Sequence, residues 1–148
     1  MKIKIKKLDE NAVIPSYAKI GDAGLDLIAV SKNLVKSDGG EFIEYGTGLA
    51  VEIPEGHVGL IFPRSSVSNV NLMLTNKVGV IDSGYRGEIK FRFKHIRKDS
   101  SLKEYEVGDK IGQMIIIPYP SVEFEETLEL SESSRGAGGF GSSGITIK

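Results

Sequence analysis

Alternation of apolar and polar residues with a period of two is the feature that most constrains how this chain can fold. It starts in MKIKIKK at residues 1–7, where isoleucine alternates with lysine. It recurs in EIKFRFKHI at 88–96, where isoleucine, phenylalanine and histidine share one face and lysine and arginine share the other. Successive side chains of a β-strand point to opposite faces, so both segments predict half-buried strands.

Three further segments have the composition of strands that end at a proline, which cannot continue a central ladder. They are GLAVEIP at 48–54, HVGLIFP at 57–63 and KIGQMIIIP at 110–118. Between the strands lie GG, PEG, SGYRG and VGDK, which favour turns. Helical periodicity is almost absent, apart from a short helix expected in or near PRSSVSNVN at 63–71. We therefore predict an all-β protein, a distorted jelly-roll β-barrel of many short strands.

Length and charge narrow the possible partners. A chain of 148 residues, 40% hydrophobic and 26% charged, suits one globular domain. A formal net charge of −1 provides no global attraction to nucleic acid or to acidic membranes, so we expect direct binding to neither. The chain has no cysteine, which excludes disulfides, thiolate zinc sites and cysteine nucleophiles. With no signal-peptide pattern, we expect a soluble, cytoplasmic protein, without excluding a nuclear or organellar copy.

The C-terminal segment RGAGGFGSSG at 135–144 contains five glycines in ten residues. The composition changes at about residue 131, which predicts a barrel domain at 1–130 and a flexible glycine-rich arm at 131–148. Gly136 to Gly141 matches the dinucleotide pattern G-x-G-x-x-G, but only seven residues follow, too few for the helix that this pattern requires. Two interpretations remain: a disordered tail, or a segment whose backbone N–H groups, with Arg135 and Phe140, close on an anionic ligand.

GVIDSGYRGEIK at 79–90 predicts a β-hairpin with Asp82 at its tip. An aspartate at a turn often only caps backbone donors. The functional alternative is a carboxylate that orients and deprotonates a water molecule, with Tyr85 packed against a sugar ring.

Two other segments carry candidate ligand groups. In FPRSSVSN at 62–69, Arg64 and the two serines after it suit a phosphate, although the arginine could instead pair with a carboxylate. In GDAGLDL at 21–27, Asp22 and Asp26 satisfy a turn, or alternatively one of them holds a magnesium ion through its waters. The two histidines, His57 and His95, lack the spacing of metal ligands and are interpreted as structural or exposed.

These segments, in this order, resemble the five motifs of the homotrimeric deoxyuridine triphosphatases. The matching stretches are AGLDL at 23–27, PRSS at 63–66, NKVGVIDSGYRGE at 76–88, GDKIGQ at 108–113 and RGAGGFGSSG at 135–144. The resemblance spans nearly the whole chain. It implies hydrolysis of dUTP to dUMP and pyrophosphate with Mg²⁺ as cofactor, in a homotrimer whose active sites are each built from three chains.

The resemblance also implies a role for individual residues. Asp82 looks like the aspartate that activates the attacking water, and Tyr85 like the tyrosine under the deoxyribose that excludes a 2′-hydroxyl. The uracil edge and the nucleoside would be contacted by residues of the third motif and the strand after it, namely Asn76, Gly79, Val80, Ile81, Asp82 and Lys90.

For the phosphates, the matching positions lie in the remaining motifs. Asp26 looks like the aspartate that contacts water on the magnesium ion rather than the metal itself. The second and fourth motifs would bind phosphate oxygens through Arg64, Ser65, Ser66 and Gln113. The arm would cross from one subunit to another's site and close it through Arg135, Phe140, Gly141 and Ser142.

One departure concerns the second motif, which reads Arg-Ser-Ser-Val where many relatives have Arg-Ser-Gly-Leu-Ala. The related dCTP deaminases share the fold and also contain Arg-Ser-Ser, so a deaminase is an alternative. Those enzymes carry a glutamate in the strand after the hairpin, where this chain has Arg92. A nucleotide-responsive binding protein is the third possibility.

Overall fold

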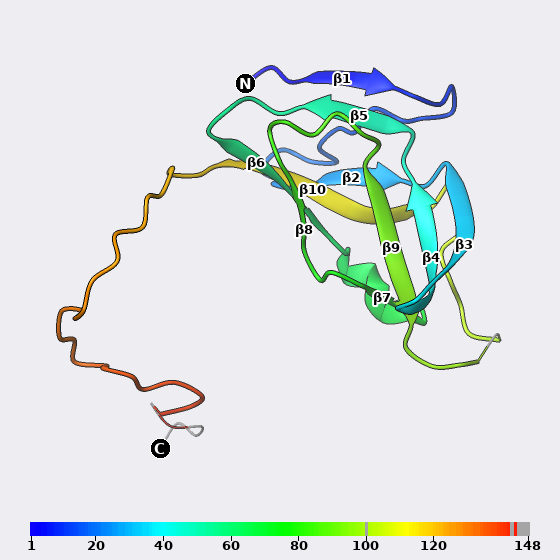
Figure 1. The fold of residues 1–148 in the computed structure, drawn as a ribbon. Coiled ribbons are helices and arrows are strands. Elements are labelled where there is room, and N and C mark those ends of the chain that lie inside the picture. The colour runs from blue at the N-terminus through cyan, green and yellow to red at the C-terminus, as the bar shows by residue number, and fades with distance from the viewer. Residues whose placement is uncertain (100, 143, 145–148) are drawn as a thin grey trace.

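A computed structural model describes residues 1–99, 101–142 and 144 of the chain. It confirms the all-β prediction, because its regular structure is almost entirely antiparallel strand (Figure 1). The strands are β1 (Lys4–Lys7), β2 (Leu25–Ile28), β3 (Ser31–Ser37), β4 (Gly40–Gly46), β5 (Leu49–Glu52), β6 (His57–Phe62), β7 (Leu72–Leu74), β8 (Gly79–Ile81), β9 (Lys90–His95) and β10 (Lys110–Pro118).

The strands form two four-stranded sheets and one two-stranded sheet. One large sheet has the order β2-β10-β6-β8, the other has the order β3-β4-β9-β7, and β1 pairs with β5. The small sheet lies over one end of the other two (Figure 1). Short strands in sheets that close on one another give the jelly-roll-like barrel expected from the sequence.

Alternation along β9 is the clearest confirmed strand pattern. Phe91 and Phe93 are fully buried, as is Ile89 just before the strand, whereas Lys90 and Arg92 are exposed. Phe93 packs edge-on against the ring of Tyr45 from the neighbouring strand, with 5.8 Å between centroids. Aromatic pairs of this geometry add to the stability that burial of the rings provides.

The proline boundaries are partly confirmed. β5 ends two residues before Pro54, and β6 ends directly before Pro63. β10 instead includes Pro118, which lies opposite His57 at the end of the ladder. A proline is tolerated at a strand end, where its missing N–H leaves no central bond unmade.

The prediction of a β-hairpin around Asp82 is wrong, because the two flanking strands do not pair with each other. The turn is present, since the N–H of Tyr85 donates to the carbonyl of Asp82 at 3.0 Å. However, β8 pairs with β6, whereas β9 pairs with β4 and β7 in the other sheet. The segment that carries Asp82 is therefore a connection between the two large sheets.

Two other local predictions have different outcomes. The short helix is confirmed as a single 3₁₀ helix, η1 (Ser65–Asn69). The segment read as a turn with two flanking aspartates divides in two: Asp22 accepts a hydrogen bond from Lys19 N at 2.8 Å, but Asp26 lies within β2.

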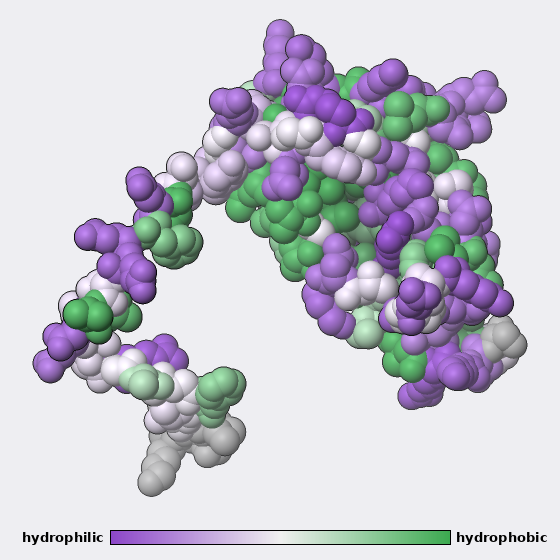
Figure 2. Space-filling model, in the orientation of Figure 1, coloured by the Kyte–Doolittle hydropathy of each residue, from purple (hydrophilic) through white to green (hydrophobic). Residues whose placement is uncertain are grey.

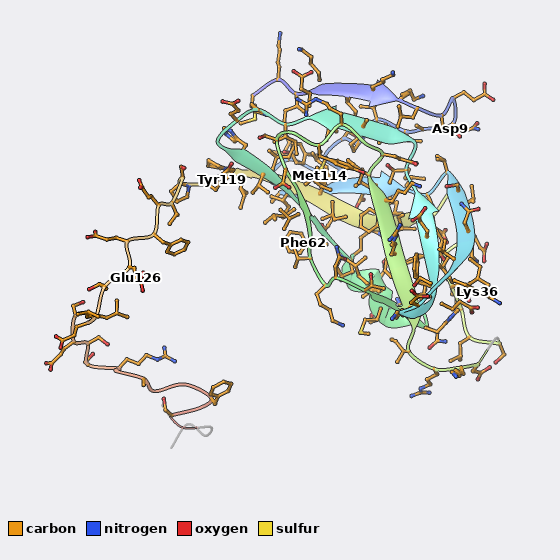
Figure 3. All side chains as sticks on the ribbon, viewed as in Figure 1. Asp9, Lys36, Phe62, Met114, Tyr119 and Glu126 are labelled. Carbon is orange, nitrogen blue, oxygen red and sulfur yellow. The ribbon has the colours of Figure 1, made fainter. Side chains whose placement is uncertain are left out.

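Beyond β10 the chain leaves the barrel. The N–H of Tyr119 donates to the carbonyl of Gly56 at 2.9 Å, and the segment from there to residue 142 has turns but no strand. Figure 3 shows Tyr119 at the point of departure and Glu126 well away from the barrel. Among the described residues, no helix is long and apolar enough to cross a lipid bilayer.

Candidate functional site

Strand register brings the first, second and fourth motifs together. In the sheet that contains β10, Gln113 lies opposite Asp26 of β2 on one side and opposite Phe62 of β6 on the other. Phe62 is followed by Pro63 and Arg64, and the side-chain amide of Gln113 donates to the carbonyl of Pro63 at 3.4 Å. Three segments far apart in the sequence therefore meet at one place on the barrel.

Asp26 is held between two cations. Arg64 Nε donates to Asp26 Oδ1 at 2.8 Å, and Lys110 Nζ lies 2.9 Å from Asp26 Oδ2. Burial raises the pKa of Asp26, but the hydrogen bond from Lys110 and the charge of Arg64 outweigh it, so the pKa lies below its ordinary value. Asp26 is thus ionised near neutral pH. Of the two interpretations of Arg64 in the sequence, the structure contains the one in which the arginine pairs with a carboxylate.

Gly24 makes room for Gln113 beside this ion pair. A Cβ at residue 24 would lie 2.2 Å from Gln113 Oε1, closer than any side chain permits. Glycine at this position allows the backbone before β2 to approach the amide.

Arg64 also begins the turn that carries the two serines. Ser65 and Ser66 open η1, and Arg64 Nη1 approaches Ser66 Oγ at 3.5 Å. A cleft of about 380 Å³ adjoins this turn. Its lining is mainly polar and basic: Arg64, Ser66, Asn69, Val70, Lys103, Tyr105, Gly108, Asp109 and Lys110. Guanidinium, ammonium and hydroxyl groups together are suited to an anion.

A second and smaller pocket, of about 290 Å³, adjoins the third motif. It is lined by Val80, Ile81, Asp82, Tyr85, Glu88, Lys90 and Arg92. Its volume is near the lower end of the range for small-molecule sites. We refer to these seven residues as the Asp82 pocket.

One wall of the Asp82 pocket is β8, which is the edge strand of its sheet. An edge strand turns the N–H and C=O groups of alternate residues away from its single neighbour. Gly79 allows this strand to lie close to β6, since a Cβ there would be 2.4 Å from Ile61 Cγ1. Asn76 lies beside the same glycine, with its Nδ2 3.2 Å from that Cβ position. The backbone of Val80 is thus available to a ligand.

Tyr85 is fixed at the turn by its own neighbours. Its hydroxyl donates to the carbonyl of Glu88 at 2.9 Å. Gly87 lies beneath the ring, and a Cβ there would be 2.4 Å from the tyrosine oxygen. The ring is still partly exposed, so one side remains open to a ligand.

The predicted arm residues lie apart from both places. Arg135 Nε donates to the carbonyl of Gly138 at 2.9 Å, which closes a turn within the arm. Phe140 is fully exposed, Gly141 has a φ of +89°, and the N–H of Ser142 donates to Gly139. In one chain, therefore, the predicted site residues form three separate groups, and no residue lines both the Arg64 cleft and the Asp82 pocket.

Some polar residues at these places were not predicted from the sequence. Lys110 was only part of the fourth-motif stretch, and it pairs with Asp26. Glu44 was not singled out at all, although it is nearly buried and bonds two residues of the Asp82 pocket. An acidic residue inside the apolar run FIEYG was the available signal.

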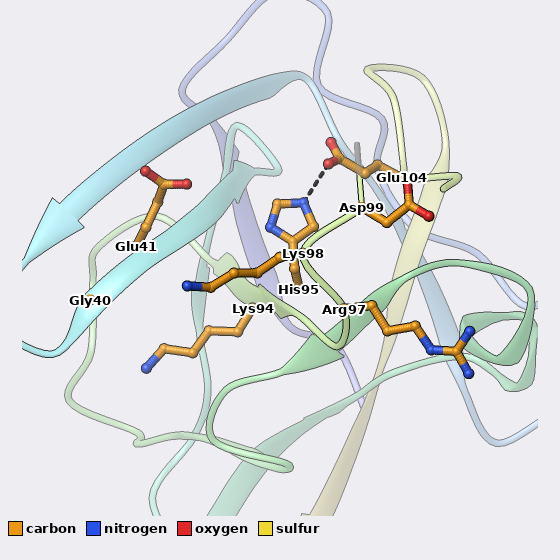
Figure 4. Close-up of a pocket in the computed structure, with 8 residues that line it drawn as sticks. All are labelled: Gly40, Glu41, Lys94, His95, Arg97, Lys98, Asp99 and Glu104. Atoms are coloured by element: carbon orange, nitrogen blue, oxygen red, sulfur yellow. Dashed lines mark hydrogen bonds and ion pairs between the residues drawn. The ribbon is translucent and has the colours of Figure 1, made fainter. Parts of the chain in front are cut away.

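A further cleft, of about 730 Å³, contains none of the predicted site residues. Figure 4 shows it between the loop after β9 and the start of β4, with His95 bonded to Glu104. Glu104 also pairs with Lys32 at 2.9 Å. His95 is therefore a structural partner of Glu104, in agreement with the sequence interpretation.

The described residues contain no group of three or more histidine, cysteine or carboxylate side chains that could hold a metal ion. A magnesium ion prefers carboxylate oxygens together with water and ligand phosphates. The sequence assigns a role at a magnesium ion to one carboxylate, Asp26. Both oxygens of Asp26 already form ion pairs, one with Arg64 and the other with Lys110. The residues present would therefore leave a magnesium ion to be held mainly by the phosphates of a ligand.

The fold and the candidate site define an antiparallel β-barrel protein with a polar, basic cleft, a small pocket beside an edge strand and a glycine-rich arm. Comparison with known proteins identifies the family. The model of the dUTPase family matches residues 10–144, and the chain belongs to the dUTPase family.

The relatives are similar over almost their full length. A deoxyuridine 5′-triphosphate nucleotidohydrolase of Clostridium acetobutylicum is 42% identical over 145 residues, which are 97% of each chain. One from Hydrogenobaculum is 40% identical and covers 98% of this chain and 99% of its own.

Solved structures show the same likeness. A dUTPase variant of Staphylococcus bacteriophage 80alpha, solved with dUpNHpp, has a TM-score of 0.83 at 29% identity, covering 97% and 99% of the two chains. A variant dUTPase of phage phi11, whose structure reveals the coordination of a structural Mg(II) ion, has a TM-score of 0.71 at 27% identity, covering 87% and 98%.

Proposed function

We propose that this protein hydrolyses dUTP to dUMP and pyrophosphate. The observation that carries the proposal is the Asp82 pocket, in which one carboxylate lies beside a fixed tyrosine and an edge strand with free backbone groups. Membership of the dUTPase family supports the same activity. The reaction removes a precursor of uracil in DNA and supplies dUMP for thymidylate synthesis.

The proposed chemistry is attack of water on the α-phosphorus. Asp82 accepts the proton of the water as its oxygen forms the new P–O bond, and the bond to the pyrophosphate oxygen breaks on the opposite side. The chain needs no covalent intermediate, because positioning and charge stabilisation supply most of the rate enhancement for phosphoryl transfer.

Uracil recognition is assigned to the backbone of β8 and the following turn. Uracil presents a carbonyl where cytosine presents an amino group, so a fixed N–H donor accepts the first and rejects the second. The roles of Gly79, Val80, Ile81 and Asn76 follow from their place at this edge. Tyr85 packs under the deoxyribose and leaves no room for a 2′-hydroxyl.

The phosphates are assigned to the second and fourth motifs. Arg64, Ser65, Ser66 and Gln113 bind phosphate oxygens, and Asp26 would contact a water of a magnesium ion held by those phosphates. When bound, Mg²⁺ neutralises charge on the phosphate oxygens as the leaving group departs. Arg64 has Nη groups that the bond to Asp26 through Nε leaves for a phosphate.

We further propose a homotrimer with shared sites, since the Arg64 cleft and the Asp82 pocket do not adjoin in one chain. Two features support an assembly. Figure 2 shows a hydrophobic surface over β6, β8 and β10, where Val78, Val80 and Ile117 are exposed. The segment between β10 and the glycines also lacks apolar contacts of its own.

That segment alternates like a strand without a partner. Every second residue is apolar apart from one glutamate, and the exposed apolar residues are Val122, Phe124, Leu128 and Leu130. The opposite face carries the acidic residues Glu123, Glu125 and Glu129. An apolar groove of about 450 Å³ beside β1 is lined by Ile3, Ile5, Ile14, Leu25 and Met114 among others, and β1 carries exposed lysines. The two surfaces are complementary in polarity and charge, which suits contact between copies.

The glycine-rich end is then carried onto a neighbouring site. Fixing glycine costs more conformational entropy than fixing other residues. Closure is therefore favourable only when a nucleotide supplies contacts, in which Arg135 reaches the terminal phosphate, Phe140 stacks on the base, and Gly141 and Ser142 approach the phosphates.

Product analysis tests the activity. Purified protein with Mg²⁺ and dUTP should release dUMP and pyrophosphate in equal amounts, without dUDP, orthophosphate or ammonia. With dCTP the protein should release no ammonia, because the position that a deaminase needs for its glutamate is occupied by Arg92. Formation of ammonia from dCTP, or slow dUTP turnover together with dUTP-dependent capture of a protein, would favour one of the two alternatives.

Subunit mixing tests the shared site. Asp82→Asn and Arg64→Ala trimers are each nearly inactive if every site needs both residues. When equal amounts of the two variants are unfolded together and refolded, about a quarter of the sites should combine Asp82 from an Arg64→Ala chain with Arg64 from an Asp82→Asn chain. Recovery of activity on mixing is the expected result, and no recovery in trimers shown to be mixed would place both residues in one chain's site.

A further inference from the structure

Glu44 is a nearly buried carboxylate directly behind the Asp82 pocket. It lies on β4, opposite Arg92 of β9, and its side chain is 11% exposed. Oε1 accepts a hydrogen bond from Lys90 Nζ at 2.8 Å, and Oε2 accepts one from Arg92 Nε at 2.8 Å. A second guanidinium nitrogen, Nη2, lies at the same distance from Oε2. Both partners line the pocket, whereas Glu44 does not.

Each cation has additional contacts that restrict it. Lys90 Nζ is 3.7 Å from Glu88 Oε2, and Glu88 uses its other oxygen to accept from the N–H of Gly48 at 2.8 Å. The guanidinium carbon of Arg92 lies 4.8 Å from the centre of the Phe42 ring, a cation–π distance. The two side chains thus present an ammonium and a guanidinium at fixed places on one wall.

Without Glu44 this arrangement would be unfavourable. Lys90 and Arg92 are two residues apart on the same face of β9, so their positive charges repel one another. A carboxylate between them offsets the repulsion and directs both donors. The same bonds hold the pKa of Glu44 below its ordinary value, chiefly through Lys90, so the carboxylate is ionised near neutral pH.

We propose that Glu44 is a positioning residue for base selection, which holds Lys90 and Arg92 as a donor-only wall of the nucleoside pocket. This inference rests on the proposed function, in that the uracil base occupies the Asp82 pocket. Ammonium and guanidinium groups donate hydrogen bonds and accept none. A wall of this kind favours a base edge with oxygen acceptors, as in uracil, over one with an amino group, as in cytosine.

The arrangement acts together with backbone recognition. A backbone N–H supplies one donor at one point, and Lys90 and Arg92 add donors on the same wall, where uracil presents its 4-carbonyl oxygen and cytosine its amino group. Glu44 touches neither base nor phosphate, so its effect on specificity passes through Lys90 and Arg92 alone.

The test is the preference between dUTP and dCTP, measured as the ratio of their kcat/KM values. Glu44→Gln removes the charge that holds both cations. It should raise KM for dUTP on the order of tenfold, leave kcat within about threefold and reduce the dUTP/dCTP ratio on the order of tenfold. Glu44→Asp, which keeps the charge, should restore part of the ratio. Glu41→Gln is the matched control. Glu41 lies on the same strand, but its ion pair with Lys36 is long, at 3.9 Å, and exposed.

A second variant keeps the test decisive if Glu44→Gln does not fold. Arg92→Gln changes a side chain that is 57% exposed, and it should reduce the same ratio while the protein stays folded. A folded Glu44→Gln or Arg92→Gln protein with an unchanged dUTP/dCTP ratio would overturn the inference, whatever happens to KM. Wild-type protein that does not hydrolyse dUTP would instead contradict the proposed function.

Discussion

Arg64 and Asp26 form an ion pair with 2.8 Å between Nε and Oδ1, although they are separated by 38 residues in the sequence. The pair joins the turn after β6 to β2, with β10 lying between those two strands in the sheet. It orients the guanidinium by its Nε and leaves its outer nitrogens available. The ion pair therefore orients the guanidinium of Arg64 and also connects two parts of the fold.

Replacement of Arg64 should consequently affect activity far more than stability. Arg64→Ala leaves Asp26 paired with Lys110, so the free energy of unfolding should fall by only about 1 kcal/mol. The loss of phosphate stabilisation should lower kcat on the order of 10²-fold or more. Arg64→Lys keeps the charge but not the fork of donors, and should recover little activity. Urea unfolding and pyrophosphate release measure the two effects, and equal losses in both would contradict the assignment.

The strands differ in how well the sequence predicts them. Strand β9 was predictable because alternation over six residues leaves one consistent choice of buried face. β2 was missed because four residues that include an aspartate carry too little periodicity. The hairpin was wrong because Gly79 allows β8 to approach Ile61, and Ile89 donates instead to the carbonyl of Leu49. Long-range partners of this kind depend on register between strands, which local sequence does not contain.

The candidate site also contains some residues that the sequence indicates and others that only the structure shows. Asp82, Arg64 and Gln113 could be proposed as site residues from the sequence because their motifs are continuous stretches with recognisable chemistry. Glu44 and Lys110 were not, because their importance comes from cross-strand contacts with residues of other motifs. The separation of the predicted residues into three groups was expected only from the family's shared sites.

Acid should abolish the contribution of Asp26 to stability. Its pKa is lower in the folded than in the unfolded protein, so the ionised form stabilises the fold above the unfolded value of about 3.9. The contribution is lost as the pH falls through the lower folded pKa. Asp26→Asn should therefore be less stable than wild type at pH 7, and the gap in urea midpoints should close below about pH 4. A gap that widened on acidification would show that the sign is wrong.

Gly112→Ala should destabilise the barrel. A Cβ at residue 112 would lie 2.2 Å from Phe91 Cε1 and 2.9 Å from the backbone oxygen of Phe62, and neither neighbour can move freely in a packed core. Overpacking of this kind costs about 1–3 kcal/mol. Gly39→Ala is the control, since its nearest neighbour would be Ser37 Oγ at 3.8 Å. Thermal unfolding should fall clearly for residue 112 and stay within a degree or two for residue 39.

Removal of the arm from Ser134 onward should separate activity from folding. The described residues of this segment bond only within the arm, so the thermal midpoint should stay close to that of the full chain. Turnover of dUTP should nearly vanish, because the proposed closure supplies Arg135 and Phe140. Phe140→Ala alone should raise KM more than it lowers kcat. Phe124→Ala, in the apolar segment between β10 and the arm, should instead weaken assembly in light scattering. Full activity after the deletion would leave the arm without a catalytic role.

Asp82→Asn tests the proposed base directly. The substitution keeps the size of the side chain and the turn to Tyr85, which uses the backbone carbonyl of residue 82, so the protein should fold and bind dUTP. Loss of a general base lowers turnover by about 10²–10⁴-fold. Asp38→Asn, at the turn between β3 and β4, is the matched control and should retain wild-type rates. Pyrophosphate release under single-turnover conditions measures the chemical step, and near-normal turnover by a folded Asp82→Asn protein would assign proton transfer to another group.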